Sequence, residues 1–106
     1  STGYSLSCGG PIIFPTSENF AITPVAPHNL NVRPIIVSND SVLSFVVEGR
    51  NESFLCTLDS RYEAIDSSYQ LAVRKEDFTV SLMRIKDDNY LNTIRSKLGW
   101  GADQRN

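Results

Sequence analysis

The sequence of 106 residues has very little of what metal centres and disulfide frameworks require. It contains one histidine, His28, and two cysteines, Cys8 and Cys56. A single histidine excludes a two-histidine metal site within the chain, and the cysteines lack the spacing of zinc ligands. Two cysteines are also too few for a disulfide framework, so the cysteine usage predicts a reducing, cytoplasmic setting.

Long apolar runs and an excess of one charge are also missing. No run approaches the ~18 residues of a membrane span, and no basic leader with an apolar stretch begins the chain. Ten basic and 12 acidic residues give a net charge of −2. We therefore expect neither a membrane nor a nucleic acid as partner. The sequence also holds no complete GxxxxGK[ST] or GxGxxG phosphate loop.

Proline is absent from the last two thirds of the chain, because all five prolines lie at or before Pro34. Proline removes a backbone donor and restricts the residue before it, so the first third should consist of short extended pieces and turns. The composition is otherwise typical of a folded chain, with 41% hydrophobic and 21% charged residues. The length allows one domain, or one piece of a larger protein.

The middle of the chain alternates β-branched and aromatic residues with polar ones. This period of two predicts short strands in two antiparallel hairpins, 43–48 with 53–58 and 69–74 with 78–82. The polar residues 59–68 between the hairpins are expected to be irregular. The pattern indicates a mainly β fold, either a sandwich or an open curved sheet.

Each end of the chain departs from the β pattern. Asp88 or Asn89 can cap a helix whose apolar residues recur at helical spacing over 90–98, and Gly99 suits the left-handed position after it. Residues 1–8 predict about two helical turns, which a Gly-Gly-Pro sequence then ends. A helix that short needs a docking surface, because it is not stable alone.

Three segments carry candidate chemistry, and each also has a purely structural interpretation. Residues 1–11 offer hydroxyls and backbone amides at a helix start, which can hold an anion or a ribose or simply cap the helix. His28 lies in the proline-rich segment 23–30 and either lines a pocket or is solvated. Asp59 ends a strand and either binds a substrate or caps a turn.

Four segments together resemble the NAD kinase family. The sequence STGYSLSCGGPI at residues 1–12 resembles that family's motif TPTGSTAYSLSAGGPI, entered at its Ser-Thr-Ala-Tyr. Residues 22–29, followed by Arg-Pro-Ile at 33–35, resemble the segment L-T-P-I-x-P-H-x-L…R-P-[IL]. Residues 58–61 resemble the [LF]-D-G-[QR] turn, and residues 98–106 are similar to the C-termini of NAD kinases from the Bacteroides lineage.

The chain departs from the family pattern at three positions and lacks two family segments. Gly3 and Cys8 stand where the family has Ala, and Ser60 stands where it has Gly. The GGDG segment, which supplies the catalytic aspartate, and the Asn-Glu pair, which binds the acceptor nucleotide, are not in this sequence. The resemblance thus implies no catalytic residue in this chain, and a fragment that is inactive alone.

The resemblance implies an antiparallel, β-sandwich-like C-terminal domain of the NAD kinase fold, with a short helix at each end. Residues 1–106 would form this single NAD-binding domain fragment, without the N-terminal catalytic domain. The implied activity is transfer of the γ-phosphoryl of ATP, or in some members of polyphosphate, to the adenosine-ribose 2′-hydroxyl of NAD, giving NADP. Mg²⁺ or another divalent cation would accompany ATP, bound mainly by the missing domain.

By the family's pattern, the NAD-binding residues would be Thr2, Gly3, Tyr4, Ser7 and Asp59. Tyr4 and Ser7 would face the same ligand, because helical residues three apart share a face.

The same resemblance implies self-association. Ala26, Pro27 and His28 match a segment that reaches the site from a neighbouring subunit, in a homo-tetramer or a dimer. Two other functions stay open at this point. One is a relative of the diacylglycerol and sphingosine kinases, which would need an apolar groove for lipid. The other is a β-sandwich interaction module without catalysis.

Overall fold

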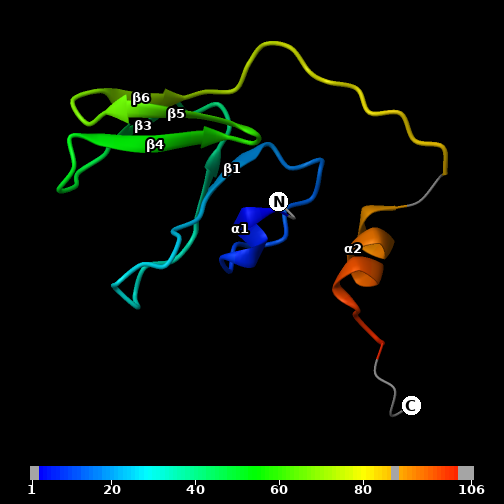
Figure 1. Cartoon of the computed structure of the whole chain (residues 1–106). Coiled ribbons are helices and arrows are strands. Elements are labelled where there is room, and N and C mark those ends of the chain that lie inside the picture. The colour runs from blue at the N-terminus through cyan, green and yellow to red at the C-terminus, as the bar shows by residue number, and fades with distance from the viewer. Residues whose placement is uncertain (1–2, 87–88, 103–106) are drawn as a thin grey trace. The chain divides into compact units, whose positions relative to one another are not determined.

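The computed structural model of the chain describes residues 3–86 and 89–102. Its elements are helix α1 (Tyr4–Ser7), strands β1 (Asn19–Ile22), β2 (Ile35–Ser38), β3 (Leu43–Val46), β4 (Ser53–Leu58), β5 (Arg61–Asp66) and β6 (Gln70–Val73), and helix α2 (Tyr90–Leu98). Figure 1 shows this order along the ribbon. The structure confirms the predicted fold class, which is mainly β with a short helix near each end.

The chain divides into two compact units, which are described separately. The first consists of residues 1–36 and 78–106, and the second of residues 37–77. The boundary falls within β2, which pairs with β1 in a two-stranded sheet. The prediction of a single domain fragment over 1–106 remains a prediction.

The second unit contains two antiparallel ladders. Strand β4 pairs with β5 from Ser53 opposite Asp66 to Leu58 opposite Arg61. Strand β3 pairs with β6 from Leu43 opposite Val73 onward. The two ladders line a common cavity, which makes the unit sandwich-like.

The predicted hairpin of residues 43–48 with 53–58 is wrong, because β4 pairs with β5 instead. The residues after β4 were expected to be irregular, but Arg61–Asp66 form β5. A loop of only Asp59 and Ser60 joins β4 to β5, and Asp59 takes the left-handed backbone (φ 52°) that a tight hairpin needs. The shorter loop costs less closure entropy than the six residues between β3 and β4.

The second predicted hairpin is also wrong. Strand β6 (Gln70–Val73) does form where a strand was expected, but its partner is β3 rather than residues 78–82. The structure gives residues 74–86 no helix and no strand. Alternation shows that a segment can pair, but it does not identify the partner.

The C-terminal helix agrees closely with the prediction. Asn89 is its N-cap, and its side-chain Oδ1 accepts a hydrogen bond from the Asn92 backbone N at 2.8 Å. Gly99 ends the helix in the left-handed conformation (φ 68°). Asp88, the alternative cap, lies outside the described residues. Ile94 is 1% exposed, the one fully buried hydrophobic residue of the described parts.

The first unit also contains an aromatic contact and a one-turn helix. The rings of Phe14 and Tyr90 meet edge to face, with centroids 5.3 Å apart, and so join the segment after α1 to α2. Helix α1 has four residues, so it is one turn rather than the two expected. Gly9 follows with φ 82°, a conformation that ends the helix without strain because glycine has no Cβ.

Candidate functional site

Helix α1 is held against the residue after β1 by a hydrogen bond between two hydroxyl groups. The Oγ of Ser5 lies 2.7 Å from the Oγ1 of Thr23. A small cavity of about 180 Å³ opens beside this contact and is lined by Tyr4, Ser5, Cys8, Ala21, Thr23 and Val25. Two of the three candidate segments thus meet in the first unit, which spacing along the chain did not reveal.

The glycine pair after α1 holds the helix in this position. Gly10 is buried, and its backbone N donates a hydrogen bond of 2.7 Å to the carbonyl oxygen of Ser5. A Cβ added to Gly10 would lie 2.6 Å from that oxygen, closer than real Cβ atoms come. Gly10 is therefore required by the fold, because it lets the chain return against Ser5.

The predicted NAD-binding residues of the first motif differ in their exposure and in their position relative to the cavity. Tyr4 is 89% exposed at the cavity. Gly3 is the N-cap of α1 and has open space where a Cβ would stand. Ser7 is exposed, hydrogen-bonds the Gly3 carbonyl at 3.5 Å and does not line the cavity. Thr2 lies outside the described residues. The roles of all four remain predictions.

The helix start does not form an anion site by itself. Helix α1 has a single turn, and no side chain caps its N-terminus. Its macrodipole is correspondingly small, so a ligand here would be held by hydroxyls and by the Tyr4 ring rather than by the helix end.

The segment with the histidine is exposed. Ala26, Pro27 and His28 all lie on the surface of the long connection between β1 and β2. Ala26 has a left-handed backbone (φ 47°), which is strained for a residue with a Cβ. The Oδ1 of Asn29 accepts a hydrogen bond from the Asn31 backbone N at 2.9 Å and so fixes the turn after the histidine.

Asp59 lies in the second unit, at the tip of the β4–β5 hairpin. It lines a shallow hollow together with Thr57, Leu58, Ser60 and Arg61. Because Asp59 and Tyr4 belong to different units, their contact with one common ligand remains a prediction. The structural interpretation of Asp59 as a turn residue is confirmed by its left-handed φ.

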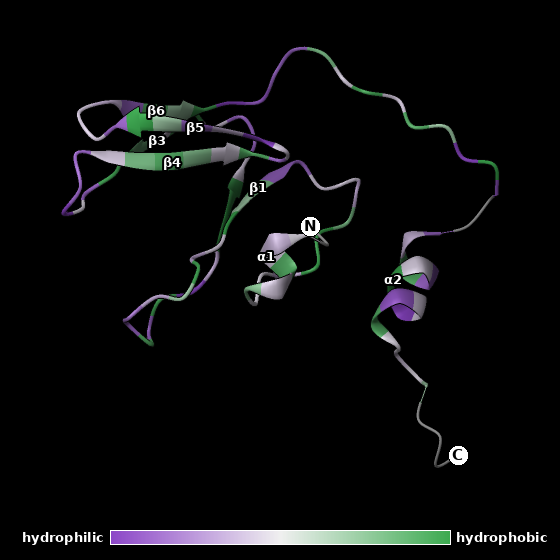
Figure 2. Cartoon of the chain, in the orientation of Figure 1, coloured by the Kyte–Doolittle hydropathy of each residue, from purple (hydrophilic) through white to green (hydrophobic). Residues whose placement is uncertain are grey.

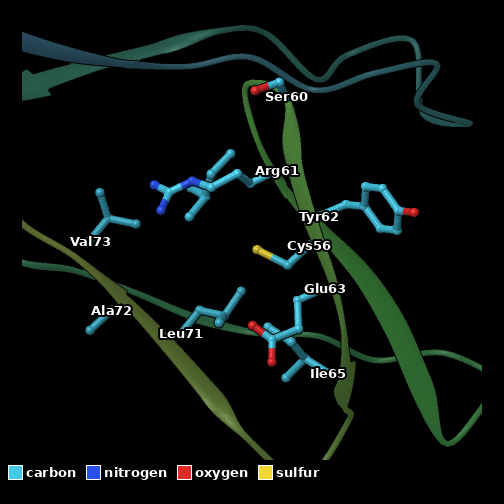
Figure 3. Close-up of a pocket in the computed structure, with 10 residues that line it drawn as sticks. Cys56, Ser60, Arg61, Tyr62, Glu63, Ile65, Leu71, Ala72 and Val73 are labelled. Atoms are coloured by element: carbon cyan, nitrogen blue, oxygen red, sulfur yellow. The ribbon is translucent and has the colours of Figure 1, made fainter.

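A larger cavity of about 650 Å³ lies between the two ladders of the second unit. Figure 3 shows Cys56 and Ile65 from the β4–β5 ladder and Leu71 and Val73 from β6 around it, with Arg61 directed across the opening. Cys56 is a free, half-buried thiol. This cavity is mostly apolar and was not predicted as a site.

One carboxylate has a clearly altered acidity. The Ser68 backbone N donates a hydrogen bond of 2.8 Å to Oδ1 of Asp66, and this bond lowers the pKa of the Asp66 carboxyl below its ordinary value. The Ser68 side chain lowers the pKa further. Asp66 ends β5, so the charge stabilises the turn into β6 rather than a binding site.

The described residues do not suit a metal ion. Over 3–86 and 89–102, no group of three or more His, Cys, Asp or Glu side chains is close enough to hold one. In the same ranges, no helix is both long and apolar enough to span a bilayer.

Sequence reasoning missed the residues that build the small cavity. Ser5, Thr23 and Val25 lie inside the quoted motifs but were not singled out. Their signal was present, since Ser5 is on the opposite side of α1 from the exposed Ser7, and Thr23 directly follows a strand. The contact between them depends on tertiary structure, which neither motif encodes alone.

Comparison with known proteins identifies the family. A model of the ATP-NAD kinase C-terminal domain matches residues 1–85. The NAD kinase of Cytophaga hutchinsonii is 58% identical over 106 residues, which are 100% of this chain and 36% of that protein. The NAD kinases of Christiangramia forsetii and Bacteroides fragilis are 42% and 44% identical, again with 36% of each covered.

By these matches the chain is a mainly β domain that is similar, along its whole length, to part of a kinase. The chain belongs to the ATP-NAD kinase C-terminal domain family. This favours the NAD kinase interpretation over a lipid kinase or a free-standing interaction module. The chain spans about 36% of the length of the curated relatives it matches, so the activity of the whole protein is a proposal.

Proposed function

We propose that this chain is the nucleotide-binding C-terminal part of an enzyme that phosphorylates NAD. The enzyme transfers the γ-phosphoryl of ATP to the adenosine-ribose 2′-hydroxyl of NAD and yields NADP and ADP. Such a transfer depends on placing the hydroxyl in line with the phosphoryl group and on neutralising charge. This chain contributes the placement, and the catalytic aspartate comes from the rest of the polypeptide.

The hydrogen bond between Ser5 and Thr23 carries the proposal. It joins the STGYSLS motif to the Thr-Pro-Val-Ala-Pro-His segment. Each of these two stretches resembles a different motif of the same family. The contact creates a cavity whose rim holds the exposed ring of Tyr4. An exposed aromatic ring beside hydroxyl groups suits an adenosine, because the base can stack while the ribose accepts and donates hydrogen bonds.

Each proposed contact has a chemical role. Thr2, Gly3 and Tyr4 contact the adenine and its ribose, and the open space at Gly3 lets the nucleotide approach the backbone. Ser7 adds a hydroxyl one turn along the helix. Asp59 approaches the nucleotide on its 2′ side, where its carboxylate accepts a hydrogen bond from a ribose hydroxyl.

Residues Ala26, Pro27 and His28 are proposed to reach the site of a neighbouring subunit. Their exposure and the strained backbone of Ala26 support a segment built for an external contact. The enzyme would then be a homo-tetramer or a dimer. His28→Ala should lower kcat without changing Tm, whereas a monomer with full activity would contradict the role.

The proposal also includes the phosphoryl donor and the cellular compartment. ATP, accompanied by Mg²⁺ or another divalent cation, is bound mainly by residues outside this chain, and polyphosphate is the alternative donor. The two free thiols, Cys8 and Cys56, are compatible with a reducing cytoplasm.

The activity is tested on the full-length parent enzyme. Purified enzyme is incubated with ATP, Mg²⁺ and NAD, and NADP is measured with an NADP-specific dehydrogenase. The proposal predicts NADP formation that requires both nucleotides. Diacylglycerol and sphingosine, tested as acceptors under the same conditions, should give no phosphorylated product. Phosphorylated lipid without NADP would overturn the proposal.

A further inference from the structure

Residues 78–82 have the sequence of a β-strand, but they form no strand in the structure. Their hydrophobic residues alternate with polar ones from Phe78 through Val80 to Leu82. Figure 2 shows hydrophobic and paler stretches alternating along the segment that leaves β6. These three side chains are 72%, 79% and 87% exposed. An extended segment with one apolar face is the form that pairs with the edge of a sheet.

The segment lies inside the range that the family model matches. The family match extends to residue 85, so it covers the segment fully. Exposed apolar side chains at this density mark a surface that is covered in the functional protein. Ile94 is the one buried hydrophobic residue in the ranges that the structure describes, so these ranges provide no core of their own for the segment.

We propose that residues 78–82 form a β-strand in the parent enzyme and pair with a strand from the part of that polypeptide outside these 106 residues. The relatives devote 64 of every 100 residues to that other part, since the chain covers 36% of each. A strand on the same polypeptide also has a high effective concentration, which a second copy lacks. The inference rests on the family and the coverage, not on the proposed activity.

Successive side chains of a strand point to opposite faces, so substitutions at two neighbouring positions of the full-length enzyme test the proposal. Val80→Asp places a charge on the apolar face, and Thr79→Asp places the same charge on the opposite face. Val80→Asp should lower Tm by about 5 °C or more, and Thr79→Asp should lower it far less. Equal effects of the two variants would overturn the proposal.

Amide hydrogen exchange of the unmodified full-length enzyme provides a second measurement. It needs no substitution, so it does not depend on whether a variant folds. The amides of residues 78–82 should exchange at least about 100-fold more slowly than in a synthetic peptide of residues 74–86. Exchange as fast as in the peptide would show that the segment is unpaired. Protection that disappears on dilution, together with subunit dissociation, would show that a second copy is the partner and would also overturn the proposal.

A photo-cross-linker identifies the occupant directly. With p-benzoylphenylalanine at position 79 of the full-length enzyme, the cross-linked peptide should come from the same polypeptide, outside residues 1–106. A cross-link to β3, β6 or another described element would show that the strand completes its own chain instead, and would contradict the proposal.

Discussion

The side-chain oxygens of Ser5 and Thr23 lie 2.7 Å apart, although 18 positions separate the two residues. This hydrogen bond is the contact that fixes α1 beside the end of β1, because the helix has only one turn and cannot be stable alone. The first two motifs therefore form one site only when this contact is made.

A double-mutant cycle measures the coupling between these two hydroxyls. Ser5→Ala and Thr23→Val each remove one partner, and the two substitutions together should cost about 1 kcal/mol less than the sum of the single effects. The free energy of unfolding of the full-length enzyme is the quantity to measure. Ser7→Ala combined with Thr23→Val is the matched control and should be additive, because Ser7 bonds Gly3 instead. Additivity in the Ser5 cycle would contradict the contact.

Gly10 should tolerate no side chain. A Cβ there would come 2.6 Å from the Ser5 carbonyl oxygen, so Gly10→Ala must push α1 away from its position. We expect a loss of about 2 kcal/mol in stability, together with a higher KM for NAD. Gly49→Ala is the control, because nothing lies within 4 Å of its added Cβ. If the two variants unfold at the same temperature, the packing of Gly10 against Ser5 is wrong.

Asp66 should make stability depend on pH in the acid range. Hydrogen bonds from Ser68 lower its pKa in the folded state, so its contribution is present above the unfolded value of about 3.8 and is lost as pH falls through the folded pKa. Urea unfolding of wild type and Asp66→Asn should therefore differ most near neutral pH. The difference should shrink as the pH falls below about 3.8. A difference that stays constant with pH would refute the assigned cause.

The sequence predicted those elements whose signals are local. The cap at Asn89, the apolar spacing around Ile94 and the left-handed Gly99 lie within a dozen residues, and the helix formed as expected. The positions of β3, β4 and β6 were also predicted, because alternation is visible within each strand. Their partners were not, since pairing depends on loop closure and on contacts between distant segments.

The candidate site could be predicted only in part, for the same reason. The motif around Tyr4 and the segment around His28 are visible in the sequence, but their meeting through Ser5 and Thr23 is a tertiary contact. Strand β5 was missed because Arg61 and Glu63 make its sequence resemble a polar loop, although both line the cavity between the ladders.

The most direct test of the central claim is the KM for NAD of the full-length enzyme with Tyr4→Ala. Stacking of a base on an aromatic ring contributes about 1–3 kcal/mol, so the KM should rise about tenfold or more while the enzyme remains folded. Tyr69→Ala, which removes another exposed tyrosine that lines none of the described cavities, should leave the KM unchanged. An unchanged KM for Tyr4→Ala would contradict the assignment of this site to the nucleotide.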